Sequence, residues 1–185
     1  MRKSYPLPPW LLLIPLLAGS IAPGIQAASK IELDARVQAT LERLQEHEIA
    51  TVELLQKASG VLVFPRVIKA GFGLGGSTGE GSLLVNYQPV QYYRTTSLSI
   101  GFQIGGQASS EVVLFMTNDA LERFRQSDGW EAGVDGSIAL ISVGIGGDID
   151  THSIQSPIIG FIFGNQGLMY ELSFEGSKFW KIHKD

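Results

Sequence analysis

The spacing of apolar residues divides the chain into a helical part and a longer β part. From Ile31 to Ala58 apolar residues recur at steps of three and four, the spacing that predicts amphipathic helix. The stretch HEIAT, residues 47–51, interrupts this spacing, so we expect two helices. Ser59-Gly60 can end the second helix, because glycine takes the left-handed cap conformation readily.

Beyond Gly60 the period changes to two, with β-branched and aromatic runs separated by turn residues, a pattern typical of strands. One short helix is predicted in NDALERFRQ, with Asn118 as its cap and arginines in its last turn. The runs that we expect as strands are residues 61–68, 70–77, 80–88, 90–94, 97–107, 110–116, 134–147, 153–164 and 167–175.

A glycine-rich pattern recurs four times in the β part: GFGLGGS from 71, GFQIGGQ from 101, SVGIGGD from 142 and GFIFGNQ from 160. On a strand Phe72 and Leu74 share one face, as do Phe161 and Phe163, and glycine, serine or glutamine occupies most of the other. Glycine inside a strand costs about 0.5–1 kcal/mol relative to alanine. We therefore expect another backbone to approach closely, or the strands to curl tightly.

The predicted fold class is mainly β (α+β). We expect a small curved antiparallel β-barrel-like sheet with N-terminal helices and one short inserted helix, in which GFGLGGSTGEG, residues 71–81, bends the sheet and turns it back.

Residues 1–27 have the composition of a cleavable signal peptide, with a basic start, an apolar middle and a small-residue end. The apolar stretch from Trp10 to Ile21 is short for a membrane span and contains Pro15 and Gly19; an uncleaved anchor is the alternative. We expect residues 28–60 to form a helical segment and 61–185 a glycine-rich β domain, together one domain in the periplasm or secreted. Without cysteine the chain has no site for lipoprotein acylation.

Charge and glycine content narrow the function classes. The 185 residues include 22 glycines, and without Arg2 and Lys3 the mature chain has 12 basic against 18 acidic residues, a net charge near −6. An acidic surface disfavours nucleic acid as a partner, because phosphate-backbone binding needs basic residues.

Three motifs could carry chemistry, and none has its usual setting. Gly71, Gly73 and Gly76 match the dinucleotide fingerprint, but a helix should follow it and here a strand is predicted. Ser77 stands in G-x-S-x-G, with Asp148 and His152 following as partners for a serine hydrolase, again without the required helix. The histidines His47, His152 and His183 are scattered, and Asp148 and Asp150 lack EF-hand spacing. We expect no metal, no cofactor and no enzymatic activity.

The segments KASGVLVFPRVIKAGFGLGGSTGEGSLLV, SIGFQIGGQASSEVVLFMTNDALERF and GVDGSIALISVGIGGDID closely resemble the SYLF family of lipid-binding domains, also called the Ysc84 family. The resemblance runs from about Leu54 to Leu172. It implies a non-enzymatic domain that associates with phospholipid membranes, in some fungal members also with actin. With an export signal and an acidic leading helix, the chain looks like a bacterial exported branch, where we expect neither phosphoinositide nor actin as partner.

We therefore expect an exported SYLF-like domain that binds phospholipid or a membrane surface. The alternatives are a cell-envelope protein-interaction scaffold without lipid binding and, more remotely, a serine hydrolase that uses Ser77. A headgroup could bind near the basic residues, or an acyl chain inside the barrel. The candidate lipid-binding residues are Lys57, Arg66, Lys69, Tyr92, Tyr93 and Arg94; Lys69 lies in the family-like KAGFG, and three lysine or arginine side chains near an anionic surface would contribute about 3 kcal/mol.

Overall fold

A computed structural model describes residues 28–47, 50–142, 155–167 and 173–185. Its helices are α1 (Lys30–His47), α2 (Ala50–Lys57) and α3 (Asn118–Gln126). Its strands are β1 (Gly60–Val85), β2 (Gln88–Phe115), β3 (Trp130–Glu131), β4 (Ala139–Ser142), β5 (Ile158–Gly167) and β6 (Lys178–Ile182). The prediction of a mainly β fold with two leading helices and one inserted helix is confirmed.

One long hairpin forms the centre of the fold. β1 and β2 pair antiparallel from Gly60 opposite Phe115 to Val85 opposite Gln88. Asn86 and Tyr87 connect them, both with positive φ (51° and 61°), as in the turns that match the twist of a two-stranded ribbon. The prediction of three strands between 61 and 88, and of three more between 90 and 116, is therefore wrong. Register shifts such as that between Phe64 and Val67 absorb the proline and glycines without ending the strands.

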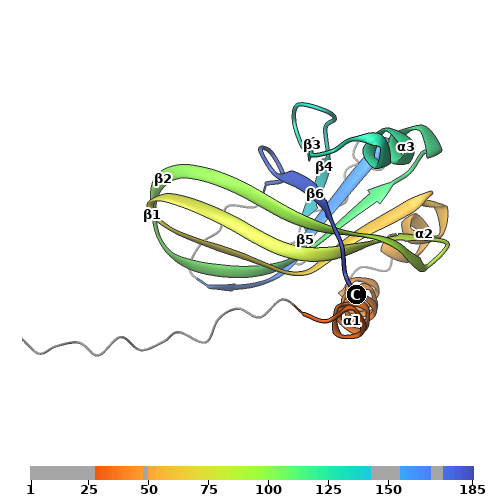
Figure 1. The fold of residues 1–185 in the computed structure, drawn as a ribbon, viewed down its shortest axis with the longest axis horizontal. Coiled ribbons are helices and arrows are strands. Elements are labelled where there is room, and N and C mark those ends of the chain that lie inside the picture. Colours follow the sequence, from red (N-terminus) through yellow and green to blue (C-terminus); the bar gives the residue numbers. More distant parts are fainter. Residues whose placement is uncertain (1–27, 48–49, 143–154, 168–172) are drawn as a thin grey trace, which may run out of the picture.

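The hairpin folds back over itself at its glycine-rich middle (Figure 1). A Cβ on Gly71 would lie 2.5 Å from Cα of Gly75, and the pairing register shifts between Phe72 and Leu74. The segment GFGLGGSTGEG thus bends the sheet while β1 continues through it. The chain reverses instead at Asn86 and Tyr87.

Close backbone approach occurs where the second half of β1 crosses its first half. A Cβ on Gly79 would lie 2.7 Å from the carbonyl oxygen of Arg66, and one on Gly81 would lie 2.2 Å from that of Val63. By contrast, a Cβ on Gly106 would meet nothing nearer than the carbonyl oxygen of Lys69, at 3.9 Å. The expectation of close packing is therefore right for the GEG segment and wrong for Gly106.

The remaining strands pair with the two halves of β2. The half from Gln107 to Phe115 pairs with β5, and β4 joins β5 in parallel. The half from Tyr92 to Thr96 pairs with β6, which carries β3 at its other side. The sheet is thus antiparallel except for β4. In the predicted strand 134–147 only β4 is strand among the described residues, and β3 and β6 were not predicted.

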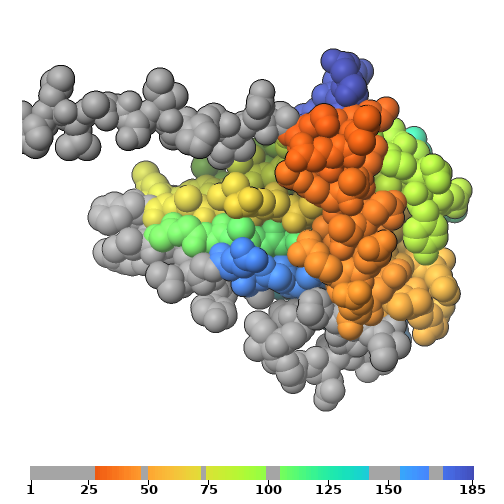
Figure 2. Space-filling model, turned by 90° about the horizontal axis from the view of Figure 1, so that it is seen from below, coloured from red at the N-terminus to blue at the C-terminus, as the bar shows by residue number. Residues whose placement is uncertain are grey.

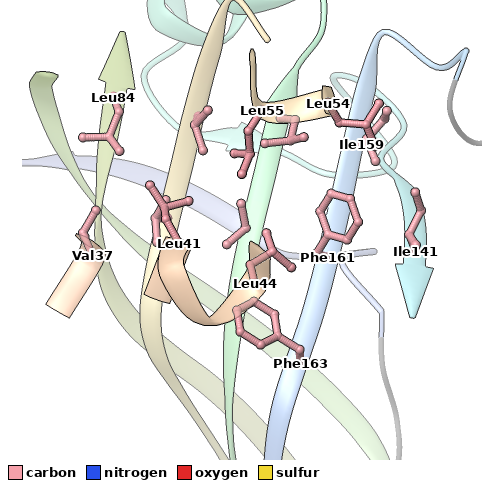
Figure 3. Packing of buried hydrophobic residues seen from close by; sticks show 14 of the residues in the cluster. Val37, Leu41, Leu44, Leu54, Leu55, Leu84, Ile141, Ile159, Phe161 and Phe163 are labelled. Atoms are coloured by element: carbon pink, nitrogen blue, oxygen red, sulfur yellow. The ribbon is translucent and has the colours of Figure 1, made fainter. Parts of the chain in front are cut away.

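Two apolar clusters hold this arrangement, one on each face of the curved sheet. The inner cluster fills the space between the two halves of the hairpin and includes Phe64, Tyr93, Phe124 and Phe179. The outer cluster lies between the sheet and helices α1 and α2. Figure 3 shows Leu44 of α1 directed toward Phe161 and Phe163 of β5. As a result α1 and α3 lie on opposite sides of the sheet (Figure 1).

Helix α3 has the predicted bounds but a different cap. Thr117 has extended backbone angles, and its side-chain oxygen accepts a hydrogen bond from the backbone N–H of Ala120 at 3.2 Å. Asn118 is already the first helical residue, so the prediction that it caps the helix is wrong. The hydroxyl of Thr117 caps the helix, one residue before the expected Asn118.

The predicted signal peptide, residues 1–27, lies outside the described residues. Of the helices that the structure describes, none has the length and apolar character required to span a bilayer.

Candidate functional site

A cavity of about 370 Å³ lies where the two halves of β1 meet under the N-terminal part of α1. Its apolar wall includes Leu33 of α1 and Pro65 and Ile68 of β1. The second half of β1 contributes Thr78, Gly79 and Glu80, and Ala28 lies beside the cavity. We call it the α1 cavity; its volume lies within the range of small-molecule sites, about 300–1,000 Å³.

Three arginines and one glutamate also line the α1 cavity: Arg36, Arg66, Arg94 and Glu80. Arg36 pairs with Glu32 at 2.5 Å, and Arg94 pairs with Glu80, its cross-strand neighbour, at 2.8 Å. Arg66 has no carboxylate partner in the described part of the chain. It is therefore the cation at the cavity whose charge is available to a ligand.

Glu80 stays ionised at this site. Partial burial favours the neutral carboxyl, but hydrogen bonds from Lys184 at 2.5 Å and Arg94 at 2.8 Å outweigh that effect and lower the pKa of Glu80. Because two cations compensate its charge, Glu80 does not offset that of Arg66.

Tyr92 and Tyr93 both serve the packing of the domain. Tyr92 belongs to the outer cluster, and its hydroxyl donates to the carboxylate of Asp34 at 2.9 Å. Burial and the neighbouring Asp34 charge raise the pKa of Tyr92 to about 12. Tyr93 faces the opposite side, where its ring lies 4.9 Å from that of Phe124, and burial raises its pKa to about 12.

The six predicted lipid-binding residues do not form one group. Arg66 and Arg94 meet at the α1 cavity. Lys57 is exposed on α2 and pairs with Glu53 at 2.6 Å. Lys69 lines a different recess, inside the curved sheet. The structure thus brings together two of the six.

The interior recess is small and polar. It measures about 30 Å³, room for a few water molecules, and it is lined by Lys69, Gln107, Glu111 and several serines. Oε2 of Glu111 has no hydrogen-bond partner in the described structure. Burial raises the pKa of Glu111 to about 8, although the Lys69 charge acts in the opposite direction. This recess therefore has no space for an acyl chain.

Ser77, the hydrolase candidate, lies in the middle of β1 and shares a hydrogen bond of 2.7 Å with Ser97. Its proposed partners, Asp148 and His152, lie outside the described residues. Among the residues that are described, no three histidine, aspartate or glutamate side chains gather as a metal site would require.

The sequence analysis did not identify Arg36 and Arg43. From α1, Arg36 lines the α1 cavity and Arg43 lines a second recess beside Ser110. The prediction treated α1 as an acidic helix, because its polar face carries many glutamates. The spacing of Arg36 and Arg43 nevertheless indicated a shared face, because residues seven apart lie on one side of a helix.

A known family matches the C-terminal part of the chain. Residues 96–184 match the model of the Ysc84 family, described as "Las17-binding protein actin regulator". The match confirms the resemblance to the Ysc84, or SYLF, family for this range. It begins within β2 and includes α3 and the strands that follow. No curated protein matches the chain significantly.

Proposed function

We propose that the chain, whose residues 96–184 match the Ysc84 family, is an exported, non-enzymatic domain that binds phospholipid at a membrane surface. The family supports a domain that binds lipid or actin. We propose lipid, because an export signal would carry the domain away from cytoplasmic actin. The candidate lipid site is the α1 cavity.

The observation that carries this proposal is the combination of an apolar wall with guanidinium groups in one cavity. Leu33, Pro65 and Ile68 offer a surface for part of an acyl chain, while Arg66 can bind a phosphate oxygen. A basic patch alone would hold the domain weakly, since each exposed cation contributes about 1 kcal/mol at an anionic membrane. Burial of apolar ligand surface supplies the additional affinity.

Figure 2 shows the face on which this contact would occur, where β1, β2 and β5 emerge side by side from under the helices. On the uncovered sheet Leu74 is 71% exposed and Leu98 is 91% exposed. Leu98 pairs with Gly76, two residues from Leu74, so both side chains project from one face of the hairpin. They would insert into the apolar edge of a bilayer.

Co-sedimentation of residues 28–185 with phosphatidylcholine vesicles, with and without phosphatidylglycerol, tests the proposal. An Ile68→Asp variant places a charge in the α1 cavity and should weaken vesicle binding about tenfold or more. Val134→Asp, at an exposed loop position, is the matched control and should bind like the wild type. Absence of vesicle binding, together with absence of co-purified lipid in native mass spectrometry, would reject the function.

The exposed pair Leu74 and Leu98 also favours a second candidate, a cell-envelope scaffold that binds another protein through this patch. Cross-linking in the native compartment separates the two. A protein adduct lost in Leu98→Ser, in a chain that binds no vesicles, would identify the scaffold.

A further inference from the structure

A second recess lies on the other side of Arg66, and we call it the bulge recess. It has a volume of about 230 Å³ and is lined mainly by polar groups of α1, β1, β2 and β5. Its principal side chains are Arg43, Arg66, Ser110 and Gln166. The irregularity between Phe64 and Val67, where the β1–β2 register shifts, creates it by displacing Pro65 and Arg66 from the regular ladder.

The guanidinium group of Arg43 is held in place by neutral acceptors. Nη2 donates to Oγ1 of Thr40 at 3.1 Å and to Oγ of Ser110 at 3.3 Å. Ser110 in turn donates to the carbonyl oxygen of Pro65 at 2.9 Å. Arg43 is thus oriented toward the bulge by a hydrogen-bond network that leaves its charge uncompensated.

The distribution of ion pairs singles out this recess. Of the six arginines in the described structure, four pair with a carboxylate: Arg36 with Glu32, Arg94 with Glu80, Arg123 with Asp119 and Arg125 with Glu122. The two without such a partner in that part of the chain, Arg43 and Arg66, line the same recess. No carboxylate is among its lining residues. In a chain with more acidic than basic residues, this arrangement favours an anion as the missing partner.

We propose that the bulge recess binds a phosphate group through Arg43 and Arg66, with Ser110 and Gln166 as neutral partners. Guanidinium groups present planar pairs of donors that match phosphate oxygens. This inference rests on the proposed function, in which the phosphate belongs to the headgroup of an anionic phospholipid. Pro65 and Arg66 line both the bulge recess and the α1 cavity, so one amphiphile can place its phosphate in the first and part of its chain in the second.

The test compares Arg43→Gln and Arg66→Gln with Arg123→Gln, which removes the same charge from exposed α3. In the mature chain each recess variant should lose about tenfold in affinity for phosphatidylglycerol-containing vesicles, while Arg123→Gln keeps wild-type affinity. Thermal unfolding verifies that all three are folded. Equal affinity of all three variants and the wild type would overturn the inference and leave the proposed function standing.

A second arm separates a lipid headgroup from a soluble phosphate. Inorganic phosphate is titrated into the wild type and the two recess variants, and the backbone amide signals of Ser110 and Gln166 are followed by NMR. If no vesicles bind, the proposed function fails. Phosphate-dependent shifts in the wild type that disappear in both variants would still support the recess as a site for a soluble phosphate compound. If the wild type shows no such shifts either, the inference is overturned together with the proposed function.

Discussion

Nζ of Lys184, near the C-terminal end, lies 2.5 Å from Oε2 of Glu80 in the second half of β1. The same ammonium donates to the carbonyl oxygen of Ala28 at 2.7 Å. The Lys184 side chain is only 8% exposed, and that of Glu80 18%. One cation thus joins the C-terminal segment, the central hairpin and Ala28, two residues before α1, beside the candidate site.

We predict that Lys184→Met destabilises the domain by about 1–3 kcal/mol in urea unfolding at pH 7, because a largely buried charge pair loses one partner. The pKa of Glu80 is lowered in the folded state. The contribution of its carboxylate is therefore present above the unfolded pKa and disappears as the pH falls through the folded value. The effect of Lys184→Met should shrink below about pH 4.

Lys181→Met is the matched control for this substitution. Lys181 pairs at 3.3 Å with Asp128, whose side chain is almost fully exposed, and exposed pairs contribute little. Equal losses of stability in the two variants would show that the Lys184–Glu80 pair has no special role.

A second prediction concerns Glu111, which is buried in the polar interior recess. Its pKa is raised from 4.5 to about 8 by burial, so the folded state keeps a proton that the unfolded chain has lost. Its contribution to stability is therefore full at pH 4 and falls as the pH rises to about 8. Between pH 5 and 9 the wild type should lose stability on the order of several kcal/mol. Glu111→Gln, which mimics the protonated group, should not show this loss.

Thermal unfolding across this pH range measures the effect. Glu122→Gln, on exposed α3, should leave the pH profile unchanged. A wild-type profile that is flat between pH 5 and 9 would contradict the buried, protonated state of Glu111.

Local patterns predicted the elements that depend on neighbouring residues. The apolar spacing in α1 and the interruption at HEIAT identified two helices, because a helix buries residues three and four apart. Strand alternation likewise indicated the β part. Strand ends were predicted wrongly, because breaks were expected at Lys69 and at Thr78-Gly79, whereas pairing with β2 carries β1 through both.

The candidate site could be predicted only in part. Arg66 and Arg94 were identified as separate basic residues, 28 positions apart in the sequence. Their common cavity depends on the hairpin folding over itself, which no short pattern encodes. Arg43 reaches Ser110 across 67 positions, and Lys184 reaches Glu80 across 104. Such contacts follow from topology, so sequence spacing gave no indication of them.

A third prediction tests the corrected cap of α3. Thr117→Ala should destabilise the domain by about 1 kcal/mol, because the backbone N–H of Ala120 loses its acceptor. Asn118→Ala should have a much smaller effect, since Asn118 is already helical. Chemical unfolding of both variants measures the difference, and the opposite order of effects would make Asn118 the cap.

The last prediction compares a hairpin glycine that another backbone approaches closely with one that has open space around it. In Gly81→Ala the new Cβ would lie 2.2 Å from the carbonyl oxygen of Val63 and 2.5 Å from the ring of Phe64. The halves of β1 would have to move apart, and we expect a loss of about 3 kcal/mol or more, as for other overpacked cores.

Gly106→Ala is the matched comparison, because its Cβ would have no contact nearer than 3.9 Å. There alanine should stabilise the strand by about 0.5–1 kcal/mol. Urea unfolding of the two variants gives the answer. If both substitutions have the same sign and size, the fold-over of β1 onto itself is not what requires glycine in the GEG segment.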